Sequence, residues 1–309
     1  MIVTLTPNPS VDRTVLVETL HRGEITRSSR SWSEPSGKGV NVALALMGHG
    51  HPATAVLPLG GPAGAHLSEM LGRSGLFFTS VRVSGDVRIN ISLIEADGTV
   101  SKINEPGPEL NRSEGEQLLD AARAHARSGD WLAGCGSLPP GLPDDYYAGL
   151  VEAGHRVGAR VVIDSSGPSL TRALAARPDL IKPNRDELAE AVAGPVDTLG
   201  DAVDAAHELR ARGAAAVLVS LGSDGVLFAG ASTTWHGTAP VGNVISTVGA
   251  GDALLAGYLS AANDIEAALA TGLRWAAAAV QSHSTVLART TAQTPVTLTE
   301  NVQRGRSLS

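Results

Sequence analysis

Residues 246–252 read Ser-Thr-Val-Gly-Ala-Gly-Asp, and an apolar run, Ala-Leu-Leu-Ala-Gly-Tyr-Leu, follows directly at 253–259. The apolar run predicts a buried helix from about residue 253, and the small residues before it predict a tight turn at the helix N-terminus. Unpaired backbone N–H groups at such a terminus carry a partial positive charge of about half an elementary unit, which attracts anions, usually phosphates. The stretch therefore predicts an anion hole formed by Gly249, Ala250 and Gly251.

Asp252 stands beside this predicted hole, where a carboxylate repels an anion unless it takes part in the chemistry. A general base that takes a proton from an attacking hydroxyl, while the N–H groups hold the developing phosphoryl charge, reconciles the two features. The alternative is an ordinary capped helix, in which Asp252 complements the helix dipole. Both interpretations stay open on this stretch alone.

The overall composition is that of a globular chain. It has 309 residues, of which 43% are hydrophobic and 18% charged, enough for one large α/β domain or two smaller ones. The net charge of −7 disfavours nucleic acid and anionic membranes as partners, and no apolar run reaches the ~20 residues of a membrane span. The single cysteine, Cys135, agrees with a reducing compartment, so we expect a cytoplasmic protein.

Apolar stretches of strand length alternate with helical patterns along most of the chain. Continuous apolar strands, such as those at 161–164 and 215–220, are typical of a parallel sheet covered by helices on both faces. One segment differs, because residues 88–94 and 99–103 alternate polar and apolar side chains around Asp97-Gly98, a strong hairpin signal. This hairpin predicts a small β-sheet lid. The tail after about residue 289 is polar and shows no periodicity.

Polar side chains stand where several of the predicted strands end. Ligands of such α/β sheets bind at the carboxyl ends of the strands, so we expect these side chains to share one site. They are Asp12, Ser137, Asp164, Lys182 and Ser220. Each also has an ordinary structural interpretation: Asp164 would cap a helix, Ser137 would form a turn, and Asn184 with Glu187 would form a capping box.

A second glycine-rich turn, Pro-Ser-Gly-Lys-Gly-Val-Asn at 35–41, also opens a helical pattern. It lacks the G-x-x-x-x-G-K-[ST] spacing, which excludes a P-loop. A dinucleotide-binding oxidoreductase would need G-x-G-x-x-G after the first strand. Thr-Pro-Asn-Pro at 6–9 stands there instead, so this class is excluded as well.

The sequence resembles the ribokinase-like sugar kinases of the phosphofructokinase B branch, specifically the bacterial 1-phosphofructokinases and tagatose-6-phosphate kinases. Two signatures carry the resemblance, at residues 36–43 and 246–253. Further similar blocks, at 6–12, 136–141 and 182–188, follow in the same order as in the family. The resemblance covers essentially the whole chain. It implies a ribokinase-like three-layer sandwich in a single domain, 1–309, with a β-sheet lid inserted at about 10–35 and 86–105.

The resemblance also implies a role for each matching residue. Asp252 would be the catalytic base, beside the hole of Gly249, Ala250 and Gly251, and Glu187 and Asp164 would hold magnesium. The residues that it assigns to the sugar and its phosphate are Asp12, Arg27, Gly37, Lys38, Asn41, Arg88, Asn90 and Ser137. Those that it assigns to ATP are Lys182, Asn184, Glu187, Ser220, Gly222, Gly225, Thr247, Gly249 and Gly251.

The expected activity is ATP- and magnesium-dependent phosphorylation of a phosphorylated ketohexose, first of all fructose 1-phosphate to fructose 1,6-bisphosphate. Tagatose 6-phosphate or fructose 6-phosphate as acceptor is the alternative within this class. The alternative from another class is a non-catalytic regulator that binds a phosphosugar, which has no need of Asp252, Asn184 and Glu187 together. The resemblance further implies a homodimer that pairs through the lid.

Overall fold

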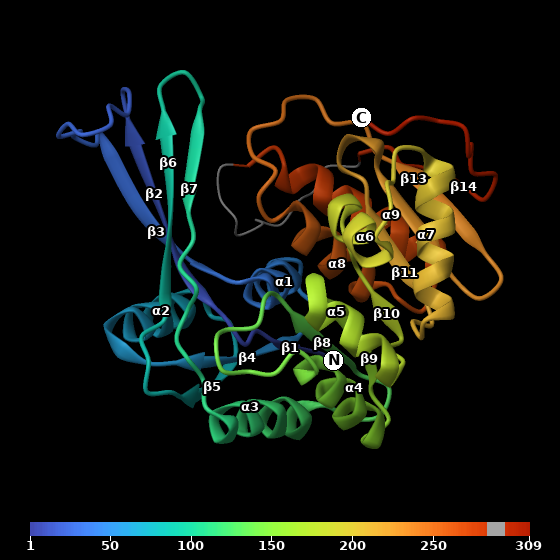
Figure 1. Ribbon diagram of the computed structural model, residues 1–309, viewed down its shortest axis with the longest axis horizontal. Helices are drawn as coiled ribbons and strands as arrows, with labels where there is room; N and C mark the ends of the chain where they lie inside the picture. The colour runs from blue at the N-terminus through green and yellow to red at the C-terminus, as the bar shows by residue number, and fades with distance from the viewer. Residues whose placement is uncertain (283–293) are drawn as a thin grey trace.

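The computed structural model describes residues 1–282 and 294–309. In this part of the chain the backbone forms one large sheet and one small sheet, with helices on both faces of the large one (Figure 1). The large sheet has, in spatial order, β14 (Thr297–Thr299), β13 (Thr234–Thr238), β12 (Val226–Ala229), β11 (Val217–Ser220), β10 (Leu180–Ile181), β9 (Arg160–Asp164), β8 (Trp131–Cys135), β1 (Ile2–Leu5), β4 (Ala53–Leu59) and β5 (Phe78–Arg82).

The large sheet is mostly parallel, as the sequence predicts. Strands β11 to β5 in the spatial order pair in parallel, whereas β12, β13 and β14 pair antiparallel. Strand β14 lies in the tail, where the sequence shows no periodicity; the first residues of that tail, 289–293, lie outside the described residues. The parallel strands end at the same edge of the sheet, which brings residues far apart in the sequence into one neighbourhood.

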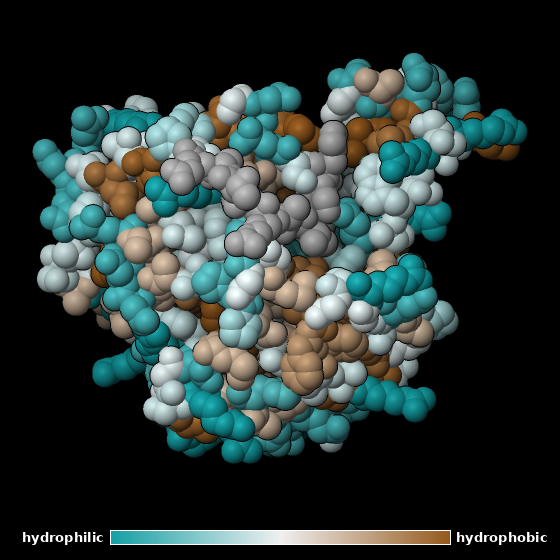
Figure 2. All heavy atoms as spheres, turned by 180° about the vertical axis from the view of Figure 1, so that it is seen from behind, coloured by the Kyte–Doolittle hydropathy of each residue, from teal (hydrophilic) through white to brown (hydrophobic). Residues whose placement is uncertain are grey.

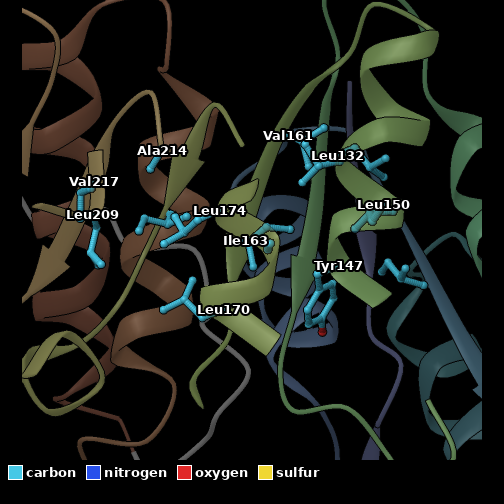
Figure 3. Packing of buried hydrophobic residues seen from close by; sticks show 14 of the residues in the cluster. Leu132, Tyr147, Leu150, Val161, Ile163, Leu170, Leu174, Leu209, Ala214 and Val217 are labelled. Atoms are coloured by element: carbon cyan, nitrogen blue, oxygen red, sulfur yellow. The ribbon is translucent and has the colours of Figure 1, made fainter. Parts of the chain in front are cut away.

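Two groups of helices cover the two faces of this sheet. One face is covered by α1 (Lys38–Gly48), α2 (Gly61–Ser74), α8 (Ala250–Ser260) and α9 (Ile265–Ala279). The other is covered by α3 (Arg112–His125), α4 (Tyr146–Arg156), α5 (Gly167–Ala173), α6 (Arg185–Val192) and α7 (Leu199–Ala211), with the short turns η1 (Leu174–Ala176) and η2 (Gly222–Asp224) between elements. Figure 3 shows the second face, where Tyr147 and Leu150 of α4 pack with Val161 and Ile163 of β9.

Helices α8 and α9 approach closely because glycines face each other. A Cβ atom on Gly257 of α8 would lie 2.7 Å from the Cα of Gly272 of α9, closer than real Cβ atoms come. The small side chains therefore let the two backbones touch. Helix α8 carries Asp252, so this contact fixes the height of the carboxylate over the sheet.

The small sheet, which we call the lid, projects from one end of the molecule (Figure 1). Its strands, in spatial order, are β3 (Arg30–Ser36), β2 (Ser10–Val17), β6 (Arg88–Glu95) and β7 (Val100–Ile103). The hairpin predicted around Asp97-Gly98 is confirmed, since β6 and β7 pair antiparallel on either side of it. Asp12 differs from expectation, because it lies inside lid strand β2 and not at the end of a strand of the large sheet.

Parts of the lid surface are apolar. Leu20, Ile25, Val100 and Ile103 are exposed, and Figure 2 shows brown, hydrophobic spheres on the projecting lid. Among residues 1–282 and 294–309, no helix combines the length and the apolar character that crossing a membrane requires.

Candidate active site

The turn at residues 246–252 forms the N-terminus of α8. Gly249 adopts a left-handed conformation (φ 80°) before the helix begins at Ala250, three residues earlier than the sequence predicts. The N–H of Ala250 turns back toward the Thr247 carbonyl over a long 3.4 Å. The N–H groups of Gly251 and Asp252 lie in the first turn, where an α-helix supplies no partner for them. The backbone geometry of this turn is therefore compatible with the predicted anion hole, with the N–H groups of Gly251 and Asp252 as its clearest donors.

Asp252 is buried and is held from α1. Its side chain is 8% exposed, and Oδ2 accepts a hydrogen bond of 2.8 Å from Nδ2 of Asn41. Burial, followed by the negative charge of Asp164, raises the pKa of Asp252 to about 6. The hydrogen bond from Asn41 acts in the opposite direction. A carboxyl with this pKa is largely ionised at neutral pH and still accepts a proton readily, as a general base requires.

Asp164 lies at the end of β9, fully buried between two lysines. Nζ of Lys38 donates to its Oδ1 over 2.8 Å, and Nζ of Lys182 lies 3.2 Å from its Oδ2. Burial opposes ionisation, but the ammonium groups of Lys182 and Lys38 outweigh it and hold the pKa of Asp164 below its usual value. Asp164 therefore forms a buried ion-pair cluster, and the helix cap that the sequence allowed is not what it makes.

Lys38, the first residue of α1, links this cluster to α6. Its Nζ also donates to Oε1 of Glu187 over 3.3 Å. Burial alone would lower the pKa of Lys38, but the carboxylates of Asp164 and Glu187 more than compensate and raise it. The two carboxylates predicted to organise magnesium thus share one ammonium group.

The capping box of Asn184 and Glu187 is confirmed. Oδ1 of Asn184 accepts from the N–H of Glu187, and Oε2 of Glu187 accepts from the N–H of Asn184, both over 2.8 Å. The other carboxylate oxygen of Glu187 faces Lys38. Capping and a position in the site therefore coexist in one side chain.

Of the residues predicted to bind ATP, Lys182 borders the turn of the predicted anion hole. A Cβ atom built on Gly251 would lie 3.4 Å from Nζ of Lys182, so this ammonium group borders the hole. Ser220, at the end of β11, bridges to Asn184 and donates its N–H to the Pro183 carbonyl. The turn after β11 has left-handed Gly222 (φ 61°) and positive-φ Gly225 (φ 90°).

The base of the lid carries a second polar cluster. Oδ1 of Asp12 accepts from Oγ of Ser10 over 2.7 Å and from Nδ2 of Asn90 over 3.0 Å. Strand β2 places Asp12 and β6 places Asn90 opposite each other in register. Gly37, directly before α1, lets the backbone pass close to Thr6, because a Cβ atom at position 37 would lie 2.8 Å from the Thr6 side chain.

Arg88 begins strand β6 and reaches back to the large sheet. Its Nη2 donates to the Asn8 carbonyl over 3.0 Å, and its Nη1 donates to the Glu105 carbonyl over 3.2 Å. Burial lowers the pKa of Arg88 from its usual value, against the carboxylates of Asp12 and Glu105. The side chain of Asn8 also donates to the exposed Ser137, at 3.4 Å. Arg88 and Ser137, both predicted to receive a phosphate, are therefore joined through Asn8.

Asn8 is a site residue that the sequence analysis did not single out. It is 4% exposed and additionally donates to the Pro106 carbonyl over 2.9 Å. The Pro-Asn-Pro that ends the first strand could have indicated this residue, because a buried asparagine side chain needs hydrogen-bond partners in neighbouring segments.

Several buried polar atoms around these clusters have no protein partner within the described residues. They are Oδ1 of Asn8, Oδ1 of Asn41, Nε of Arg88 and Oδ1 of Asn90. Buried polar groups are normally hydrogen-bonded, and their gathering in one region is what a site for a polar ligand requires.

Arg27 is not brought to this region. It is exposed and lies in the connection between the outer ends of β2 and β3, beyond the pair of Leu16 with Arg30. Asp12 and Gly37 lie at the inner ends of the same strands. Within one chain, Arg27 and the polar cluster around Asp12 therefore lie at opposite ends of the lid.

The acidic groups suit a cation held mainly by water and phosphate. In the part of the chain that the structure describes, no group of three or more His, Cys, Asp or Glu side chains could hold a metal ion. Asp164 and Glu187 form a pair of carboxylates, and Mg²⁺ usually binds through one or two carboxylates, substrate phosphates and several waters. The residues present fit magnesium delivered with a nucleotide, and do not fit an all-protein metal site.

Comparison with known proteins identifies the family of this chain. The family model for pfkB family carbohydrate kinases matches residues 7–292. The chain is 36% identical over 260 residues to the 1-phosphofructokinase of Bacillus subtilis, covering 84% of this chain and 85% of the relative. It is 35% identical over 257 residues to the ATP-dependent 6-phosphofructokinase isozyme 2 of Mycobacterium tuberculosis, covering 82% and 76%.

A solved structure agrees with these relatives. The crystal structure of phosphofructokinase-2 from Escherichia coli in complex with potassium superposes with a TM-score of 0.87 at 32% identity, covering 93% of this chain and 94% of the other. The ribokinase-like fold that the resemblance implies is thereby confirmed. By its family match, its relatives and its fold, this chain belongs to the pfkB family of carbohydrate kinases and is phosphofructokinase-like.

Proposed function

We propose that this protein transfers the γ-phosphoryl group of ATP to the 6-hydroxyl of fructose 1-phosphate, giving fructose 1,6-bisphosphate. The observation that carries the proposal is Asp252, a buried carboxylate with a pKa of about 6, placed in the first turn of α8, where the helix itself supplies no partner for the N–H groups. Base and anion hole stand next to each other, which is the arrangement that phosphoryl transfer to a hydroxyl needs.

The chain's own residues supply the steps. Asp12 and Asn90 hold the sugar at the base of the lid, and Arg88 with Ser137 binds the phosphate that the substrate already carries. Arginine suits this task because its planar group grips a phosphate at two points. Asp252 takes the proton of the attacking hydroxyl, and the N–H groups of the hole with Lys182 receive the transferring charge.

Magnesium, bound near Asp164 and Glu187, would neutralise charge on the phosphates. Lys38, which pairs with both carboxylates, connects that position with the sugar-binding turn. Closure of the lid over the sugar would exclude water, which otherwise competes as acceptor.

The identity of the acceptor sugar is the most specific part of this proposal. Relatives named 1-phosphofructokinase and 6-phosphofructokinase are similar to this chain at nearly equal identity. Fructose 6-phosphate or tagatose 6-phosphate is therefore the alternative acceptor, and it requires the same base and hole.

A non-catalytic phosphosugar-binding regulator is the alternative from another class. Such a protein has no need for a carboxylate at an anion hole, where its charge repels the ligand. The joint presence of Asp252, Asn184 and Glu187 in one chain supports catalysis over sensing.

We further propose that two chains pair through their lids in a cytoplasmic homodimer. Exposed apolar side chains on the lid, Leu20, Ile25, Val100 and Ile103, support this. In a dimer of this kind, Arg27 at the outer end of one lid would be available to the partner chain.

The test is ADP release with magnesium-ATP against fructose 1-phosphate, fructose 6-phosphate, tagatose 6-phosphate, fructose and ribose. A kcat/KM at least about tenfold higher for fructose 1-phosphate, or roughly 1.4 kcal/mol of transition-state preference, supports the proposal. Preference for a 6-phosphate keeps the mechanism and changes the acceptor. Tight phosphosugar binding without turnover would instead favour the regulator.

A further inference from the structure

The segment 302–309, which we call the C-terminal strap, runs along the start of α7. Backbone N–H groups of Leu199 and Gly200 donate to the carbonyls of Arg306 and Arg304 over 2.9 Å and 2.8 Å. In the other direction, the N–H of Leu308 donates to the Asp197 carbonyl over 2.8 Å. A Cβ atom on Gly200 would lie 2.8 Å from the Arg304 carbonyl oxygen, so the strap lies tightly against α7.

The strap ends on Asp224, a buried carboxylate in the turn after β11. Oδ1 of Asp224 accepts from Nη2 of Arg306 over 2.7 Å. Oδ2 accepts from both the N–H and the hydroxyl of Ser309, each over 2.7 Å. Although burial opposes ionisation, the hydrogen bonds from Ser309 and Arg306 hold the pKa of Asp224 below its usual value. Asp224 is therefore an anion whose partners come from the strap.

Asp224 stands between Gly222 and Gly225, in the turn to which the proposed function assigns ATP. The backbone of this turn is fixed from the side of β13, where Nε2 of His236 meets the Asp224 carbonyl over 2.8 Å. The N–H of Leu221 donates to the Gly225 carbonyl over 2.8 Å and closes the turn. The strap holds the same turn from the opposite side, through the carboxylate.

The strap also reaches the other ATP segment. Nη1 of Arg185 donates to the Ser309 carbonyl over 2.9 Å, and Arg185 directly follows Asn184. The hydroxyl of Ser309 is 2.7 Å from that of Ser223, within the turn. One end of the strap thus joins the turn after β11 to the N-terminus of α6.

We infer that Arg306 is a positioning residue for ATP: through Asp224 it sets the place of the turn 221–225 relative to α6. The inference rests on the proposed function, since it takes these two segments as the ATP site. Arg306 contacts the turn through the Asp224 carboxylate and is assigned no part in the chemistry. Its loss should move the turn and weaken nucleotide binding, while the sugar cluster at the lid stays as it is.

The strap supplies a matched control. Arg304 is two residues away and pairs with Asp204 of α7 over 2.6 Å, both side chains being largely exposed. Arg304→Ala removes the same charge from the same segment and leaves the turn untouched. Arg306→Lys keeps the charge opposite Asp224 and should restore part of what Arg306→Ala loses.

The experiment measures KM for ATP, KM for the phosphosugar, and the Kd of a fluorescent ATP analogue for each variant. For Arg306→Ala we expect KM for ATP and the analogue's Kd to rise about tenfold, with KM for the phosphosugar within about twofold of wild type. Arg304→Ala should leave all three unchanged.

The opposite results are equally clear. If Arg306→Ala matches Arg304→Ala, or raises both KM values together as a general loosening would, the inference is wrong. Absence of turnover in the wild type contradicts the proposed function alone, and the analogue's Kd then decides the inference by itself. A wild-type chain that binds no nucleotide overturns both.

Discussion

The amide of Asn41 donates to Oδ2 of Asp252 over 2.8 Å, and both side chains are buried. The sequence assigned Asn41 to the sugar and Asp252 to catalysis, so the bond joins two roles. Its donor stabilises the ionised carboxylate, which makes Asn41 a determinant of the pKa of the base.

Asn41→Ala should shift the acid limb of the pH profile. Without the donor, the pKa of Asp252 rises above about 6, so kcat/KM should begin to fall about one pH unit higher than in wild type. The measurement is kcat/KM as a function of pH, over about two pH units on either side of neutrality.

Asn90→Ala is the control for that profile. Asn90 is another amide that we predict to bind the sugar, but its partners are Ser10 and Asp12. Both variants should lower kcat/KM, and only Asn41→Ala should move the limb. If the acid limb of the pH profile lies at the same pH in both variants, Asn41 does not set the pKa of Asp252.

Asp252→Asn should lose activity and gain stability. Loss of the base should lower kcat by about a hundredfold or more. The folded pKa of about 6 lies above the ordinary aspartate value of 3.8, so the protonated carboxyl favours folding. That contribution is complete below pH 3.8 and is lost as the pH rises through 6. In urea unfolding, the free energy of unfolding of the variant should therefore exceed that of wild type at pH 8 by on the order of 2 kcal/mol. At pH 4 the two free energies should be equal. A variant that keeps near-normal turnover while folded would remove Asp252 from catalysis.

Asp164→Asn should destabilise the fold. The change leaves Lys182, which is 3% exposed, as a buried charge without its carboxylate, at a cost of about 3 kcal/mol at pH 7. The folded pKa of Asp164 is below 3.8, so its contribution is present above that pH and lost at lower pH. The difference in unfolding free energy should shrink in acid.

Asp197→Asn provides the comparison for this stability measurement. Asp197 pairs with Arg185 at 3.5 Å and is 74% exposed. Exposed pairs contribute little, so we expect a change within about 0.5 kcal/mol. If Asp164→Asn behaves the same way, the buried cluster does not support the fold as described.

Arg88→Ala should reduce the preference for phosphorylated acceptors. The guanidinium group is predicted to grip the substrate's phosphate, so kcat/KM should fall by about a hundredfold for the phosphosugar and little for the unphosphorylated sugar. Arg13→Ala is the matched control, because Arg13 is exposed and lies next to Asp12 on β2, so its side chain points to the opposite face of the lid. A parallel loss for both acceptors in Arg88→Ala would show a structural role only.

Much of the fold is readable from local patterns. Continuous apolar strands predicted the buried parallel sheet, and Asp97-Gly98 predicted the lid hairpin, because both signals depend on residues close together in the sequence. Strand β14 was missed, since its residues, Thr297–Thr299, acquire a strand conformation by pairing with β13 and have no apolar period of their own.

The site was readable only in part, for a related reason. Which residue types gather at the strand ends follows from the sequence, whereas their partners do not. Lys38 and Asp164 are 126 positions apart, and nothing local to either predicts their ion pair. Asn8 was missed because its function is to connect other residues.

The position of β1 between β8 and β4 also governs how the molecule assembles. Its register joins Ile2 to Ala53 on one side and to Trp131 on the other, so this part of the sheet depends on contacts between distant parts of the chain. Topologies of this kind fold slowly, whereas hairpins such as β6–β7 form within microseconds. After dilution from denaturant, the β6–β7 hairpin should therefore regain its strands early, and phosphoryl transfer should return only when β4 and β8 have paired with β1. The time at which enzymatic activity returns would then report when the sheet is complete.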